Sequence, residues 1–192
     1  SSTRRGLARD MKRVERFCPL ASGSKGNCSL LQTESATLLI DAGISMKELQ
    51  KRLALVGSSL SDIDAIIVTH EHHDHIAGIK TLTSNYSIPV IANYLTAEAI
   101  VEALDTCPPF KIFTTGEPFS FKNLEIDTFS IQHDGVEPIA LTIHTGARKI
   151  GICTDLGFIT KTVIHKLKLC QLLLIEANHH PDSVLMSSRP DS

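Results

Sequence analysis

The 192 residues of this chain suffice for one domain with a hydrophobic core, and no apolar run approaches the ~20 residues that a membrane span needs. Hydrophobic residues make up 42% and charged residues 21% of the sequence, as in ordinary globular proteins. The net charge of −2 argues against a surface that binds nucleic acid through basic residues alone, although bound divalent cations would add positive charge beside a substrate phosphate.

The amino-terminal part begins with a short polar stretch and continues with alternating strand and helix signals. Residues 1–10 lack the apolar stretch of a secretory signal, so we interpret them as a disordered or tag-like leader and residues 11–192 as one domain. In chain order we predict two or three strands within 14–40, a helix at 45–56, a strand at 63–69, a helix opening at Asp74, a strand at 88–92 and a helix at 96–104.

The carboxy-terminal part is dominated by strand signals. In chain order we predict a hairpin at 117–130 turning at Lys122 and Asn123, a strand pair at 139–144 and 149–154, a helix at 158–169 and a buried strand at 171–176. Many strands with interspersed helices favour an α/β or α+β sandwich.

Residues 68–75 concentrate metal-ligating side chains directly after a predicted buried strand. The metal-capable residues are His70, His72, Asp74 and His75. Imidazole and carboxylate groups suit zinc, manganese and iron. Because residues i and i+2 of an extended segment point the same way, the first two histidines can share one metal, and the last two residues can reach a second where a helix begins.

Four other histidine and acidic residues are not interpreted as metal ligands. Glu71 and His73 alternate away from the cluster and are expected to face outward. A solvated histidine-rich loop is the alternative for the whole segment, but the strand–turn–helix context favours a metal site. His144 and His165 are interpreted as unrelated to the site.

The H-x-H-x-D-H run resembles the signature of the metallo-β-lactamase fold superfamily, and three other segments resemble its further motifs in the same order. Residues 39–43 resemble the first motif, in which Asp41 would support the ligands from behind, together with Thr69. Residues 130–134 resemble the third motif and residues 152–155 the fourth. The resemblance implies a four-layer αββα sandwich in which His133 joins the first metal and Asp155 bridges both.

Within the superfamily the chain is most similar to the YycJ/WalJ-type branch. The shared segments are residues 20–27, with a Ser-Gly-Ser-x-Gly-Asn pattern, and residues 174–179. The late histidine of the fifth motif has no counterpart after His180. We therefore expect a carboxy-terminally truncated domain, the alternative being that His179 or His180 replaces the missing ligand.

Two divalent ions, Zn or Mn, would activate a bridging water that attacks the substrate, with Asp74 and Asp155 as the catalytic carboxylates. The Asp74 ligand and the resemblance favour a phosphodiesterase with 5′→3′ exonuclease activity on DNA. The alternatives are a thioester or ester hydrolase of glyoxalase type acting on a small molecule, and a metal-binding protein without turnover.

Three further expectations concern the surroundings of the protein. The five scattered cysteines form no Cys-x-x-Cys pair, which favours reduced thiols and a cytoplasmic location. Lys25, in the Gly-rich segment 22–27, could meet a phosphate, but the sequence favours a solvated turn lysine. No membrane partner is expected, and the residues do not indicate an oligomeric state.

Overall fold

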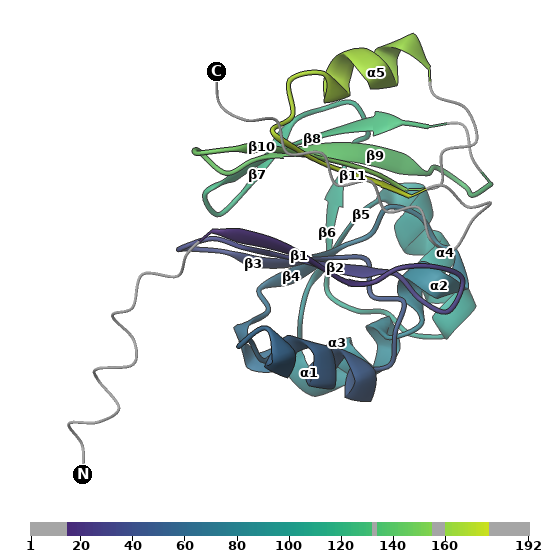
Figure 1. Ribbon diagram of the computed structural model, residues 1–192. Coiled ribbons are helices and arrows are strands. Elements are labelled where there is room, and N and C mark those ends of the chain that lie inside the picture. Colours follow the sequence, from purple (N-terminus) through teal and green to yellow (C-terminus); the bar gives the residue numbers. More distant parts are fainter. Residues whose placement is uncertain (1–14, 132–133, 155–159, 177–192) are drawn as a thin grey trace.

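The computed structural model describes residues 15–131, 134–154 and 160–176 (Figure 1). The leader predicted at 1–10 lies outside these ranges. None of the helices within them is long and apolar enough to cross a membrane.

The amino-terminal half forms a six-stranded sheet in the order β1-β2-β3-β4-β5-β6. The pairs β1–β2 and β2–β3 are antiparallel, whereas β3 to β6 run parallel. The strands are β1 (Arg16–Ala21), β2 (Cys28–Gln32), β3 (Thr37–Ile40), β4 (Ala65–Ile67), β5 (Val90–Asn93) and β6 (Phe110–Phe113). The helices between them are α1 (Met46–Leu55), the 3-10 helix η1 (Leu60–Asp62), α2 (His73–Ile76), α3 (Ile79–Tyr86) and α4 (Tyr94–Leu104).

The carboxy-terminal half forms a five-stranded sheet in the order β11-β10-β9-β8-β7. Only β10 and β11 pair in parallel, and the other neighbours are antiparallel. The elements are β7 (Phe119–Phe121), β8 (Leu124–Ser130), β9 (Ile139–His144), β10 (Lys149–Thr154), α5 (Lys161–Leu167) and β11 (Leu172–Glu176).

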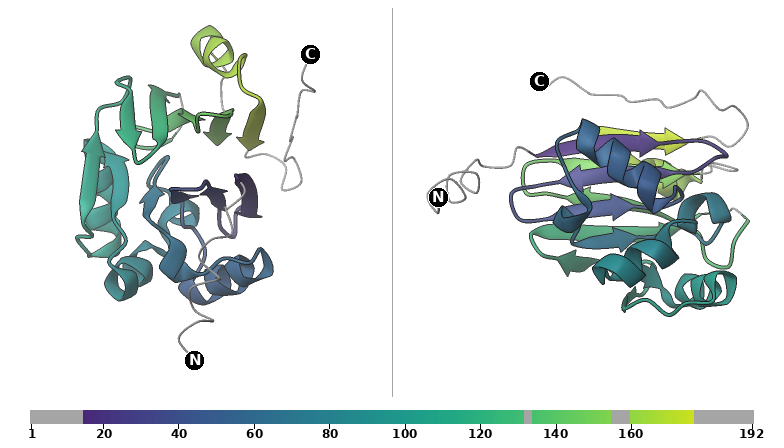
Figure 2. Two further views of the ribbon diagram at one scale, coloured as in Figure 1. Left: turned by 90° about the vertical axis from the view of Figure 1, so that its left-hand side faces the viewer. Right: turned by 90° about the horizontal axis from the view of Figure 1, so that it is seen from below.

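The two sheets stack face to face with helices outside, which confirms the predicted αββα sandwich (Figures 1 and 2). Alternating side chains of each strand separate into different cores. Leu39 and Ile66 pack outward against α1 and α3, whereas Leu38 and Ile67 pack inward against the second sheet. A third core lies between the second sheet and α5, where Val163 contributes.

Helix α1 shows how the sequence pattern produces this packing. The Ser45 side chain accepts a hydrogen bond from the Glu48 backbone N–H at 3.2 Å and caps the first turn. Leu49 and Leu53 are fully buried against the first sheet, and each contributes roughly 1.5–3 kcal/mol by leaving water. The amphipathic helix predicted at 45–56 is therefore present with its expected face inward.

Two predictions about elements were incomplete. The helix expected from Asp74 is split into α2 and α3 at Gly78, where an added Cβ would lie 2.2 Å from the Ile44 carbonyl oxygen. The Gly78 N–H donates to the Ala42 carbonyl at 2.8 Å instead of to the preceding helical turn, which interrupts the helical hydrogen bonding. Strand β6 was not predicted, because only Phe113 of its four residues is buried and the alternation signal is weak.

Candidate metal centre

The histidine cluster lies where strand ends from both sheets meet. Backbone hydrogen bonds join Asp41 N–H to the Ile67 carbonyl at 2.8 Å and Ile139 N–H to the Thr69 carbonyl at 3.0 Å. The hydroxyl of Thr69 also lies 3.3 Å from that of Thr154, at the end of β10. The short segment between β4 and α2 is therefore fixed to both layers of the sandwich.

The structure brings together the four predicted ligands of this segment. The ring centroid of His70 lies 4.6 Å from that of His72 and 4.0 Å from that of His75. Nε2 of His75 lies 3.6 Å from Oδ2 of Asp74. His70 and His75 are buried, whereas a quarter of the Asp74 side chain is exposed, so solvent reaches the cluster on the Asp74 side.

The carboxylate of Asp41 holds the cluster from behind. Its Oδ1 accepts a hydrogen bond from the Thr69 backbone N–H at 2.8 Å, and its Oδ2 accepts one from the Thr69 hydroxyl at 2.7 Å. Oδ2 also lies 2.7 Å from Nδ1 of His75. This contact ties His75 to Asp41 through Nδ1, and the other ring nitrogen, Nε2, lies 3.2 Å from Nδ2 of Asn27.

Thr69 makes a corresponding contact with His70. Its hydroxyl hydrogen is used by Asp41, so its oxygen accepts from Nδ1 of His70, 3.0 Å away. Thr69 therefore ties His70 through Nδ1, as Asp41 ties His75. Asp41 and Thr69 thus lie where the sequence expected supporting residues, and each contacts Nδ1 of a predicted ligand.

Asn27 is a site residue to which the sequence reasoning gave no role. Its Nδ2 lies 3.0 Å from Oδ2 of Asp74 and 3.2 Å from Nε2 of His75. Its backbone N–H donates to the Asp74 carbonyl at 2.7 Å. Asn27 is 5% exposed and follows the Gly/Ser-rich segment whose pattern was noted, but sequence spacing does not show that this segment contacts residues almost fifty positions later.

The expectation for Glu71 was wrong, because its carboxylate does not face solvent. Oε1 accepts a hydrogen bond from the Val136 backbone N–H at 3.0 Å, and Oε2 is buried. Asn93 donates to the carbonyl of Glu137 at 2.9 Å in the same loop. Glu71 therefore anchors the segment that follows the predicted third motif. His73 is exposed, as expected.

The described residues fit a divalent metal but do not by themselves form a complete cage. Three imidazoles and one carboxylate are suitable donors, and two of the rings are tied back through Nδ1, as metal-bound histidines usually are. Within the described ranges no group of three or more histidine, cysteine or acidic side chains already surrounds one point. The predicted ligands His133, Asp155 and His179 lie outside those ranges.

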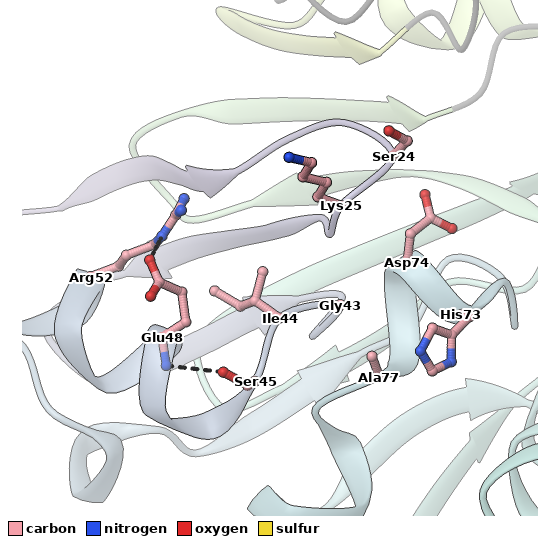
Figure 3. Close-up of a pocket in the computed structure, with 10 residues that line it drawn as sticks. All are labelled: Ser24, Lys25, Gly43, Ile44, Ser45, Glu48, Arg52, His73, Asp74 and Ala77. Carbon is pink, nitrogen blue, oxygen red and sulfur yellow. Dashed lines mark hydrogen bonds and ion pairs between the residues drawn. The ribbon is translucent and has the colours of Figure 1, made fainter.

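A cavity of about 750 Å³ adjoins the cluster on the Asp74 side (Figure 3). It lies between the segment 22–27, the start of α1 and the start of α2. Its lining consists of Ser24, Lys25, Gly43, Ile44, Ser45, Glu48, Arg52, His73, Asp74 and Ala77. One predicted metal ligand therefore faces a cavity large enough for part of a substrate.

Comparisons with known proteins agree with this architecture. A family profile described as the metallo-beta-lactamase superfamily matches residues 21–183. The exodeoxyribonuclease YycJ of Bacillus anthracis is 33% identical over 176 residues, which cover 91% of this chain and 67% of that protein. The exodeoxyribonuclease WalJ of Streptococcus pneumoniae is 33% identical over 169 residues, covering 85% and 62% respectively.

Among solved structures, the metallo-beta-lactamase fold protein YhfI from Bacillus subtilis superposes with a TM-score of 0.69. The match covers 88% of this chain and 73% of YhfI at 20% sequence identity, so it bears on the fold alone. The chain spans about two thirds of the length of the two curated relatives.

Proposed function

Because this chain belongs to the metallo-β-lactamase superfamily, we propose that it is a metal-dependent phosphodiesterase that degrades DNA from the 5′ end. The observation that carries the proposal is the position of Asp74. Its carboxylate lies beside His75 and lines a cavity whose other charged residues are Lys25, Arg52 and Glu48. A carboxylate ligand makes a site harder than imidazoles alone and favours phosphate-ester chemistry. The names of the two relatives that are 33% identical support DNA as the substrate.

In this proposal the ligands divide between two divalent ions, Zn or Mn. His70, His72 and His133 would hold the first ion, Asp74 and His75 would hold the second, and Asp155 would serve both. When bound, such a pair supplies Lewis acidity and lowers the pKa of a coordinated water. His179 is proposed as the replacement for the late histidine if this chain is catalytically complete.

The described residues have roles of their own in this proposal. Thr69 and Asp41 hold His70 and His75 through Nδ1, so Nε2 is the ring nitrogen that each would offer to a metal. Asn27 donates to Oδ2 of Asp74 and limits the rotation of that carboxylate. These contacts pre-organise the ligands before a metal binds, which reduces the free-energy cost of ordering them.

The proposal is tested with a 5′-end-labelled DNA duplex in the presence of Mn²⁺. We expect wild-type protein to release nucleotides and Asp74→Ala to be slower by more than about a hundredfold, because loss of supporting contacts alone already costs 10–100-fold. Glu102→Ala removes an exposed carboxylate from α4 and serves as the matched control.

Three results would contradict the proposal. Wild-type protein that hydrolyses S-acyl glutathione but leaves DNA intact would identify a thioesterase instead. Protein that binds metal and turns over neither substrate would be a metal-binding protein without catalysis. If Asp74→Ala and wild type degraded DNA equally, the activity would not belong to this cluster.

A further inference from the structure

The cavity beside Asp74 contains one cationic side chain that the fold does not use. Arg52 is occupied: its Nε donates to Oε1 of Glu48 at 2.9 Å, and its Nη1 donates to the Leu20 carbonyl. That bond with Arg52 holds the pKa of Glu48 below its ordinary value, so the two charges compensate each other. Lys25 makes no hydrogen bond or ion pair with any described residue and extends over the cavity (Figure 3).

The backbone that carries Lys25 is fixed relative to Asp74. Gly26 N–H donates to the Gly23 carbonyl at 3.2 Å and closes the turn. Gly26 has a φ of +146°, and an added Cβ would lie 2.6 Å from the Gly43 carbonyl oxygen. With Asn27 bonded to both the backbone and the side chain of Asp74, Lys25 is presented at a defined position rather than on a free loop.

Two other polar features of the cavity favour the same kind of ligand, and of the two carboxylates that line it, that of Glu48 is paired with Arg52. The first turn of α1 lies at its base, where Ser45 caps the Glu48 N–H and the preceding N–H groups have no intrahelical partner. The positive end of the helix dipole therefore adds to the lysine charge. Ser24 contributes a hydroxyl at the rim. A cation, N–H donors and a hydroxyl are the groups that bind phosphate oxygens in proteins.

We propose that this cavity is a subsite for a phosphate of the bound nucleic-acid strand other than the one that is cleaved, with Lys25 as its cationic contact. This inference rests on the proposed function for the identity of the ligand. The volume of about 750 Å³ accommodates a phosphate with its sugar, since ligand pockets generally measure about 300–1,000 Å³. The subsite positions the strand so that the neighbouring phosphate reaches the cluster at Asp74.

The test measures binding without turnover. Fluorescence anisotropy of a labelled duplex of about 12 base pairs is followed in EDTA over a range of salt concentrations. The proteins compared are wild type, Lys25→Gln and Lys51→Gln. The duplex is about one helical turn long, which is the length that a DNA-binding module contacts. Lys51 is an exposed lysine on α1, the helix that lines the cavity, but its own side chain does not line the cavity. Lys51→Gln therefore removes the same single positive charge as Lys25→Gln, at a position outside the cavity.

We expect Lys25→Gln to weaken binding about 3- to 10-fold and to reduce the salt slope by about 0.7–0.9, the value for one lost phosphate contact. Lys51→Gln should change affinity less than about twofold and leave the slope unchanged, because an exposed charge away from the contact is screened by salt. Equal effects of the two substitutions, no effect of Lys25→Gln, or no binding by wild type would overturn the subsite.

Two further arms identify the source of the phosphate. If the subsite binds a 5′-terminal phosphate, removing that group from the duplex reduces the affinity of wild type but not of Lys25→Gln. If it binds an internal phosphodiester, a neutral methylphosphonate at one internal position has that effect instead. A wild type that binds with the Lys25-dependent slope yet releases no nucleotides with Mn²⁺ would refute the nuclease proposal and leave the subsite standing.

Discussion

At the scale of single residues, Asp41 connects the backbone conformation to the chemistry of the cluster. It adopts a φ of +59°, in the left-handed region that few residues other than glycine, asparagine and aspartate occupy readily. From there one carboxylate reaches the Thr69 N–H, the Thr69 hydroxyl and Nδ1 of His75. The end of β3 and the position of the His75 ring are therefore held by the same side chain.

We predict that Asp41→Asn lowers metal affinity about 10- to 100-fold with little loss of fold, because asparagine tolerates the left-handed backbone but provides one oxygen acceptor instead of two. Competition with a metal-binding dye measures the affinity. Asp105→Asn is the matched control, since Asp105 has a φ of +47° and is exposed. An unchanged metal affinity in Asp41→Asn would show that the carboxylate has no supporting role.

Cys28 gives a second prediction at this scale. Burial raises the pKa of its thiol, and the charge of Asp41 adds to the rise. Iodoacetamide reacts with thiolates, so at pH 8 the native protein should be labelled at the exposed Cys107 and not at Cys28, as peptide mass spectrometry would show. In the unfolded chain this thiol has a pKa of about 8.5, whereas in the native protein it keeps its proton to higher pH. The free energy of unfolding is therefore unaffected by this group below about pH 8.5 and falls as the pH rises above that value.

At the scale of elements, the site depends on three segments whose backbones touch. Asn27 N–H donates to the Asp74 carbonyl, and Gly43 N–H donates to the Asn27 carbonyl at 2.9 Å. These bonds join three segments into one unit: the turn that precedes β2, the segment that follows β3 and the start of α2. A Cβ on Gly43 would lie 1.6 Å from the Asp74 carbonyl oxygen, so this position has no room for a side chain.

We therefore predict that Gly43→Ala displaces Asp74 and destabilises the protein by about 2–4 kcal/mol, in the range of severe point mutations. Gly116→Ala is the control: Gly116 has a φ of +90° but open space around its Cβ, so it reports backbone strain alone, of about 1–2 kcal/mol. Urea denaturation measures both. A Gly43→Ala protein that is as stable as Gly116→Ala would contradict the close approach.

The sequence predicted the elements and the cluster better than the contacts between segments. Periodicity predicted α1, the hairpin of β7 and β8 and the pairing of β9 with β10, because local patterns determine these. The family resemblance and the four-layer sandwich are confirmed as well. The roles of Asn27 and Glu71 could not be predicted, since each depends on a partner more than forty positions away.

At the scale of the whole molecule, the cluster lies at the junction of the two sheets, so metal binding is linked to the stability of both. We predict that saturating Mn²⁺ or Zn²⁺ raises the melting temperature by about 5–10 °C, because a ligand at 100 times its Kd contributes about 2.7 kcal/mol. Differential scanning fluorimetry with and without chelator measures the shift. Asp74→Ala should show a smaller shift, and an equal one would place the bound metal elsewhere.

The two sheets are also separate in the order of the chain: the first is built from strands between residues 16 and 113 and the second from strands between 119 and 176. Synthesis proceeds at about 5–20 residues per second. All strands of the first sheet therefore leave the ribosome several seconds before the strands of the second sheet that will cover them. Meanwhile its inner face, with Leu31, Leu38 and Ile67, is exposed to solvent. A ribosome-bound chain just long enough for β6 to have left the exit tunnel should crosslink to a nascent-chain chaperone more strongly than one long enough for β11 to have left it.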